Sequence, residues 1–191
     1  MSNIINFANI DFSGSSANSS GGGSSSGYSD VDGMCYAYSA ITEFPEGWKF
    51  APRTGYSGAN LFEECYNLIT IPQLDTSEIT NFSCMFSGCS SLTTVPQLNV
   101  SKATTLYEIV YGCSSLTTLG GFIGLSINLD LAWAPYLTHD SLMNVINNLA
   151  TVTSSTKLTL NVNSSTILTD EEKKIATDKG WTLKFSDYQK A

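Results

Sequence analysis

The sequence predicts a short α/β solenoid with a parallel sheet on one edge and irregular coil, then helices, on the other edge. The first observation behind this prediction is a repeat of about 24 residues in the middle third of the chain. Self-similarity at a short fixed period is typical of solenoids, in which each turn buries its apolar edge against the next turn. The second observation is a strand–helix–strand–helix–strand order after residue 125, which predicts parallel strands joined by right-handed crossovers.

The N-terminal part of the chain divides into an apolar segment and a linker. The segment 1–12 is short and apolar, so it could pair with the solenoid edge as a strand or dock elsewhere as a peg. Residues 13–29 form the linker, because thirteen of the fifteen residues 13–27 are Ser or Gly and bury too little surface to offset ordering. A phosphate-binding loop is the alternative, but no Lys follows the glycines, so we favour a flexible tether.

Residues 30–125 hold the repeats. A cysteine column and a leucine column recur through three copies, at Cys65, Cys89, Cys113, Leu68, Leu92 and Leu116. An earlier copy begins near Met34 and is followed by an interval three residues longer. The apolar residues of each turn step by three rather than alternate, and Pro72 and Pro96 each remove a backbone donor. We therefore expect strands of two to four residues on one edge and irregular coil on the other.

Residues 126–191 are expected to form a C-terminal βαβαβ continuation and cap. Its three strands are predicted over residues 125–131, 158–162 and 181–185. Thr138 is a candidate N-cap for a helix with apolar residues at i, i+3, i+4 and i+7. Thr169 and Glu172 form a capping box that opens a second helix, which Gly180 ends. The simplest arrangement extends the sheet of the repeats, with helices in place of coil on the outer edge.

The charge of −8 at pH 7 bears on partners and location. Between Arg53 and Lys157 the only basic residue is Lys102, so we expect no nucleic acid partner and little attraction to anionic membrane. No run approaches the ~18–20 apolar residues that span a bilayer, so we expect no membrane insertion. The N-terminus lacks the basic and apolar regions of a signal peptide. Either the chain is not exported by the usual route or the sequence begins after a removed signal, so its localisation stays open.

The five cysteines are an odd number, so they cannot all pair with one another. Neighbouring turns about 4.8 Å apart would allow a disulfide between them. A recurring small apolar slot filled by buried thiols explains the column more simply, because unpaired cysteine is among the most buried residue types.

No pattern of catalytic or metal-ligating residues stands out, so we expect a non-enzymatic protein without cofactor or metal. The single histidine, His139, lies at the start of a predicted helix, where a solvated side chain is the simpler interpretation. Glu63, Glu64, Asp75 and Glu78 could serve as paired carboxylates of a glycosidase, but on a repeat edge they indicate a solvated acidic face.

The candidate binding site is a surface rather than a pocket. Hydroxyl and amide residues recur at the repeat period, and these candidate site residues are Thr70, Thr94, Thr118, Gln73, Gln97, Asp75 and Asn99. Rows of such groups at strand spacing could present hydrogen bonds to a polymer, a glycan or an extended peptide. The alternative is that these side chains bond to one another and solvate the edge.

The stretch from Met85 to Pro96, Met-Phe-Ser-Gly-Cys-Ser-Ser-Leu-Thr-Thr-Val-Pro, resembles the BspA-like leucine-rich repeat family and related mycoplasma-type surface-protein repeats. Asp75-Thr-Ser-Glu-Ile-Thr-Asn81 matches the second half of that motif, and the resemblance covers residues 34–125. The segment that begins with Ala134 to Leu142 and runs through Lys179 to Trp181 looks like the tail of such proteins in gut Bacteroidales and their phages.

This resemblance implies a leucine-rich repeat protein for adhesion or binding, which recognises a host surface, glycan or protein without catalysis. Its location would be the cell surface, the extracellular space or a virion. The chain has fewer turns than the family pattern. The alternative function is therefore a phage or prophage particle component, either a tail-associated structural protein or a receptor-binding protein.

Overall fold

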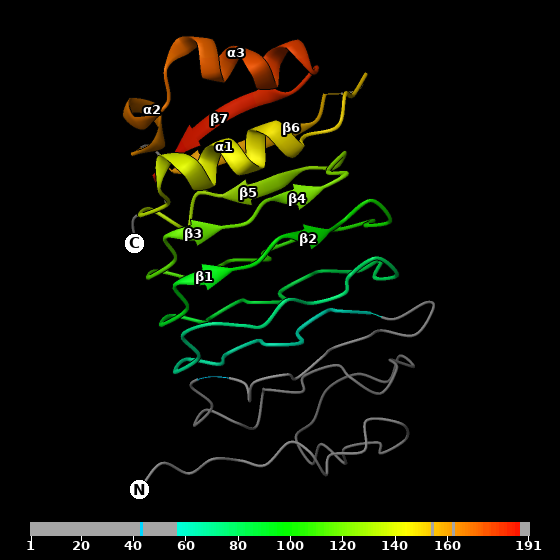
Figure 1. Cartoon of the computed structure of the whole chain (residues 1–191), viewed down its shortest axis with the longest axis vertical. Coiled ribbons are helices and arrows are strands. Elements are labelled where there is room, and N and C mark those ends of the chain that lie inside the picture. The colour runs from blue at the N-terminus through cyan, green and yellow to red at the C-terminus, as the bar shows by residue number, and fades with distance from the viewer. Residues whose placement is uncertain (1–42, 44–56, 154, 162, 188–191) are drawn as a thin grey trace, which may run out of the picture.

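The protein has a mixed α/β fold with small parallel sheets and few helices (Figure 1). The computed structural model describes residue 43 and residues 57–153, 155–161 and 163–187. Its elements, in chain order, are β1 (Thr94–Val95), β2 (Leu98–Asn99), β3 (Thr118–Leu119), β4 (Phe122–Ile123), β5 (Leu129–Leu131), α1 (His139–Asn148), β6 (Lys157–Asn161), α2 (Ser164–Ile167), α3 (Asp170–Asp178) and β7 (Thr182–Ser186). The expected N-terminal segment 1–12, the linker 13–29 and the copy near Met34 lie outside the described residues.

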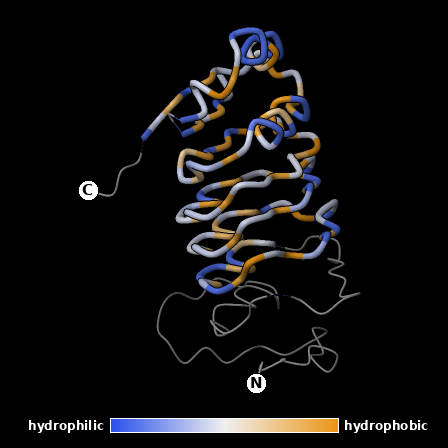
Figure 2. The backbone as a smooth tube through the Cα atoms, turned by 60° about the vertical axis from the view of Figure 1, so that its left-hand side comes forward, coloured by the Kyte–Doolittle hydropathy of each residue, from blue (hydrophilic) through white to orange (hydrophobic). Residues whose placement is uncertain are grey.

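The sequence repeat is also a repeat in space. Strands β1 and β3 pair in parallel with Thr94 opposite Thr118, and β2 and β4 pair in parallel with Leu98 opposite Phe122. The two partners of each pair are separated by one repeat period. We call the stacked segments 57–80, 81–104 and 105–128 the first, second and third rungs (Figures 1 and 2). Strands β1 to β4 have two residues each, which agrees with the short strands expected from the prolines.

The core lies inside the rungs. Leu68, Leu92 and Leu116 are fully buried and belong to one hydrophobic cluster, in which successive rungs pack against each other. Phe62 and Phe86 occupy one repeat position and stack with ring centroids 5.5 Å apart and planes 6° apart. Burial of such large apolar side chains is the main term that stabilises the stack.

A ladder of backbone hydrogen bonds joins the rungs on the side away from β1 and β3. Every second amide of one rung donates to a carbonyl of the next, for example from Cys84 to Tyr107 at 2.8 Å and from Phe86 to Ile109 at 3.0 Å. We call this pattern the amide ladder. It requires left-handed backbone at two repeat positions, which the sequence does not announce. These positions, all with φ between 53° and 77°, are Asn60, Cys84, Glu108, Glu64, Gly88 and Gly112.

The C-terminal part matches its local predictions but not the single sheet expected. Thr138 caps α1 by accepting a bond from the Ser141 amide, and Thr169 with Glu172 forms the capping box of α3. Strands β5, β6 and β7 are parallel, as expected, but they form a separate three-stranded sheet. The continuous sheet was therefore a wrong prediction. The four-residue helix α2 was not predicted.

Helix α1 ends the β1–β3 sheet, and this explains why that sheet does not continue. The buried Ser141 hydroxyl accepts a bond from the Leu119 amide and donates to the Thr117 carbonyl, both at 3.0 Å. The Asn144 side chain donates to the Leu119 carbonyl at 3.1 Å. Side chains of a helix thus satisfy backbone groups that a further strand would otherwise pair.

Replacing Gly120 by alanine tests how tightly the rungs stack. A Cβ at Gly120 would overlap the Gln97 nitrogen and lie 2.8 Å from the Pro96 carbonyl carbon, so the backbone must shift. We expect Gly120→Ala to lower the free energy of unfolding by about 1–3 kcal/mol. Urea unfolding followed by circular dichroism measures this effect, with Thr118→Ala at a nearby exposed position as the control. An unchanged urea midpoint for Gly120→Ala would contradict close stacking there.

The contact between α1 and α3 predicts a pH-dependent stability. The Nε2 atom of His139 lies 2.8 Å from Oε1 of Glu172. Hydrogen bonds to Glu172 and then to Asp140 raise the pKa of His139 above its ordinary 6.5. Bonds from the Thr169 amide and then from His139 lower the pKa of Glu172 below its ordinary 4.5. The histidine contribution is complete below pH 6.5 and is lost as pH rises through the raised pKa, and that of Glu172 is complete above pH 4.5.

We therefore expect His139→Gln to lower the melting temperature more at pH 5.5 than at pH 8.5. Thermal unfolding by circular dichroism at the two pH values measures the difference. Lys174→Gln is the matched control, because it breaks an exposed pair with Asp178 in α3 that involves no histidine. An equal effect of His139→Gln at both pH values would argue against the pairing.

Candidate ligand-binding site

The structure brings the predicted threonines and glutamines together on one edge of the stack. Thr70 pairs with Thr94 through an isolated parallel bridge, and Thr94 pairs with Thr118 in the β1–β3 sheet. The Gln73 side chain donates to the Gln97 carbonyl at 2.8 Å. Thr70 and Thr118 are exposed and Thr94 is half-buried. The threonine column is therefore a continuous polar edge, while one glutamine is already bonded within the protein.

Asp75 and Asn99 have a local role that accounts for their recurrence. One carboxylate oxygen of Asp75 accepts bonds from the Ser77 amide at 3.1 Å and the Ser77 hydroxyl at 2.7 Å. The side-chain oxygen of Asn99 accepts the same two bonds from Ser101, at 3.1 and 2.7 Å. These are turns closed by a side chain, and the bonds from Ser77 lower the pKa of Asp75. A structural role in these turns therefore explains why Asp75 and Asn99 recur at the repeat period.

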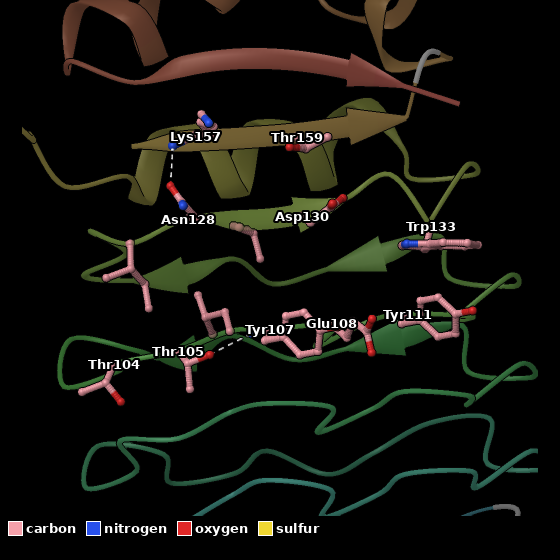
Figure 3. Close-up of a pocket in the computed structure, with 13 residues that line it drawn as sticks. Thr104, Thr105, Tyr107, Glu108, Tyr111, Asn128, Asp130, Trp133, Lys157 and Thr159 are labelled. Atoms are coloured by element: carbon pink, nitrogen blue, oxygen red, sulfur yellow. Dashed lines mark hydrogen bonds between the residues drawn. The ribbon is translucent and has the colours of Figure 1, made fainter. Parts of the chain in front are cut away.

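A hollow that sequence reasoning missed lies on another side of the molecule. It has a volume of about 650 Å³ and lies between residues 104–111, where the second rung passes into the third, and the strands β5 and β6 (Figure 3). We call it the aromatic hollow. Its main lining side chains are Tyr107, Glu108, Tyr111, Asp130, Trp133 and Lys157.

The aromatic hollow forms where the amide ladder stops. In the first and second rungs, amides at alternate positions all find a carbonyl in the next rung. The amides that would continue this pattern from the third rung belong to Leu106, Glu108, Val110 and Gly112. Within the described ranges, none of these four amides has a hydrogen-bond acceptor in the protein. Strand β5 follows at the repeat distance but pairs with β6 instead, so a gap opens between β5 and the third rung.

Larger side chains in the last copies explain why the amide ladder ends here, and they were visible in the sequence. Tyr107 stands at the repeat position of Ser83, and Tyr111 stands at that of the buried Ser87. Trp133 follows Ile109, a fully buried core residue, at the same interval, but it is half-buried. A repeat whose small and core positions become aromatic cannot stack at the same spacing. The change of residue size along the columns was the available signal.

Three aromatic side chains line the hollow. Tyr111 and Trp133 contact each other with ring centroids 4.4 Å apart and planes tilted by 56°. Tyr107 is 64% exposed and lies on the same rung (Figure 3). Exposed rings that are held in place by neighbours give large apolar contact area at small entropic cost, which is typical of binding surfaces.

The electrostatics of the hollow are mildly acidic. Glu108 and Asp130 line it together with one base, Lys157. A hydrogen bond to Glu108, and then its negative charge, raises the pKa of Tyr107. On the first rung, burial and then the charges of Glu64 and Glu108 raise the pKa of Glu63. With two carboxylates and one ammonium group in its lining, the hollow is better suited to a neutral ligand than to an anion.

The thiols of the cysteine column are buried and bonded within the protein. Cys89 and Cys113 donate their thiol protons to the carbonyls of Phe62 and Phe86 in the preceding rung, at 2.9 and 3.1 Å. Burial raises the pKa of Cys113 to about 12, and a hydrogen bond with Cys65, followed by burial, raises that of Cys89. Buried thiols in the column agree with the prediction. In the described ranges, no group of three or more acidic, cysteine or histidine side chains could hold a metal ion.

Comparisons with family models, with curated proteins and with solved structures each found no match to this chain. Within the part of the chain that the structure describes, no helix has both the length and the apolar character needed to cross a bilayer.

The buried thiols predict strong resistance to alkylation. With a pKa of about 12, only about one Cys113 side chain in 10⁴ is a thiolate at pH 8. We expect iodoacetamide at pH 8 to leave Cys89 and Cys113 unmodified in the folded protein and to label both in guanidinium chloride. Mass spectrometry of the tryptic peptides measures this. Native labelling of Cys113 at the rate of free cysteine would contradict its burial against Phe86.

Proposed function

We propose that this protein is a short leucine-rich-repeat solenoid that acts as a non-enzymatic binding or adhesion module. The solenoid proposal is supported by partners one repeat period apart in both small repeat sheets and by the regular spacing of the amide ladder. It is also supported by leucine and cysteine columns that share one core. A stack of this kind offers an extended rigid surface, which solenoid proteins use for binding.

The aromatic hollow, rather than the threonine column, is the ligand site we propose. The observation that carries this proposal is the interrupted amide ladder, which places donors without an acceptor among the described residues beside aromatic side chains. Asp75 and Asn99 beside the threonine edge are held in their own turns. A concave site with rings and a few convergent polar groups is a better ligand site than a flat polar edge. The proposed partner is a protein or a glycan, and not a nucleic acid, because the described lining of the hollow has two carboxylates and one ammonium group.

Substitutions on the two faces test this proposal. We expect Tyr107→Ala to weaken binding to an immobilised ligand at least tenfold, because an aromatic anchor is lost. Thr94→Lys with Gln97→Lys should leave that binding unchanged. Biolayer interferometry against a panel of extracellular matrix proteins and surface glycans provides the measurement. Tyr136→Ala is the matched control, since Tyr136 is 65% exposed and lies outside the hollow.

Three results would count against the proposal. Binding that is lost in the Thr94 and Gln97 variant but kept in Tyr107→Ala would move the site to the threonine column. Failure of the wild-type protein to bind any member of the panel would overturn the binding function. Release of reducing ends from a bound glycan, measured by a reducing-sugar assay, would contradict a non-enzymatic role.

A further inference from the structure

Backbone donors without a protein partner lie at the lower side of the aromatic hollow. The amides of Leu106, Glu108, Val110 and Gly112 are spaced two residues apart and, within the described ranges, have no acceptor in the protein. Equivalent amides one rung below all point at carbonyls of the third rung, so these four point toward the gap below β5, and Leu106 and Glu108 also line the hollow. A ligand that displaces water from these two amides must offer them acceptor atoms, because a donor that loses water without another partner is costly.

A straight peptide strand does not fit this row of donors well. Carbonyls on one side of an extended strand lie about 6.6–6.8 Å apart along a nearly straight line. Residues 107–112 instead form a run of turns, with left-handed backbone at Glu108 (φ 53°) and Gly112 (φ 70°). The four donors therefore follow a curve, and an added strand would reach part of the row only.

The polar side chains of the hollow suit a ligand that both donates and accepts hydrogen bonds. One oxygen of Asp130 already accepts the Ala132 amide at 2.9 Å, and a carboxylate can accept several bonds. The carboxylates of Glu108 and Asp130 can therefore accept bonds from a ligand, while the Lys157 ammonium group only donates them (Figure 3). Tyr107, Tyr111 and Trp133 add flat apolar surface beside these groups. A pyranose ring has apolar C–H faces and a rim of hydroxyls, each of which is both donor and acceptor. It can cover a ring with its face while its rim meets the amides and carboxylates.

The negative charges of the hollow favour uncharged sugars over acidic ones. Glu108 and Asp130 are in the hollow, against the single positive charge of Lys157 among the described lining residues. A sugar with a carboxylate or sulfate would bring another negative charge into this region. Uncharged sugars avoid that repulsion and still use every donor and acceptor.

We propose that the aromatic hollow binds uncharged sugar residues of a glycan, with a pyranose face on Tyr107 and hydroxyls on the amides of Leu106 and Glu108, which have no acceptor among the described residues. This inference rests on the proposed binding function and names the chemistry of the ligand for that same site. Stacking on the 64% exposed Tyr107 ring supplies the apolar contact. The Tyr111–Trp133 pair closes one end of the hollow, so it limits how far a glycan chain can extend in that direction.

Affinity gel electrophoresis of the full chain tests the inference. The probes are the neutral polysaccharides β-glucan, xylan, galactomannan and dextran, and the acidic polygalacturonate, each cast in a native gel. We expect at least one neutral polysaccharide to slow the wild-type protein and polygalacturonate to leave its mobility unchanged. Tyr107→Ala should raise the dissociation constant at least tenfold. Asp130→Asn should raise it several-fold, because a charged acceptor becomes a neutral one.

The exposed Tyr136 provides the control, and Tyr136→Ala should bind each polysaccharide as the wild type does. Circular dichroism spectra and urea midpoints of the variants show whether a lost interaction comes from lost folding. Tyr107→Ala removes an exposed ring, so its urea midpoint should stay close to that of the wild type.

The outcomes separate this inference from the proposed function. If none of the neutral polysaccharides binds, or if Tyr107→Ala binds them as well as the wild type, the sugar assignment is wrong. If a protein ligand or polygalacturonate binds instead and Tyr107→Ala abolishes that binding, the sugar assignment fails while the binding function stands. If no ligand of either kind depends on Tyr107, both proposals fail at this site.

Discussion

The backbone hydrogen bonds between rungs are the constraint on which the rest of the structure depends. The first and second rungs donate alternate amides to the rung that follows, and the strand pairs β1–β3 and β2–β4 keep the same register of one repeat period. Once the register is fixed, leucines, cysteines and phenylalanines of successive copies meet in one core. Neither apolar burial nor hydrogen bonding suffices alone. Apolar burial does not select a register, and each hydrogen bond contributes little net free energy.

The ends of this ladder shape the surface of the molecule. At β3 the bonds between the short strands end on helix α1, where side chains of Ser141 and Asn144 take the place of a further strand. At residues 106–112 the amide ladder ends without any replacement from the described residues, and the aromatic hollow results. The same repeated backbone therefore yields a sealed edge in one place and an open one in another. The difference lies in which chain segment follows one period later.

Much of the fold could be predicted because its signals are local. The recurrence of Cys65 and Leu68, the N-cap at Thr138 and the capping box at Thr169 each depend on residues close in sequence. The separate sheets and the hollow could not be predicted in this way, because they depend on whether β5 pairs with the third rung or with β6. The site signal was the replacement of small residues by Tyr107 and Tyr111, which becomes meaningful once the columns are known to stack. The placement of Thr70 beside Thr94 was predictable, but its use in binding stays a prediction.

The position of the hollow sets the valency of the proposed module. It arises at the junction between the repeated part and the sheet of β5, β6 and β7, and not within a repeat. Lengthening the stack by further copies would add core and contour length without adding another such junction. A chain of this design is therefore monovalent at this site however many copies it carries. Strong attachment to a polymeric surface would then come from avidity, with several chains displayed side by side.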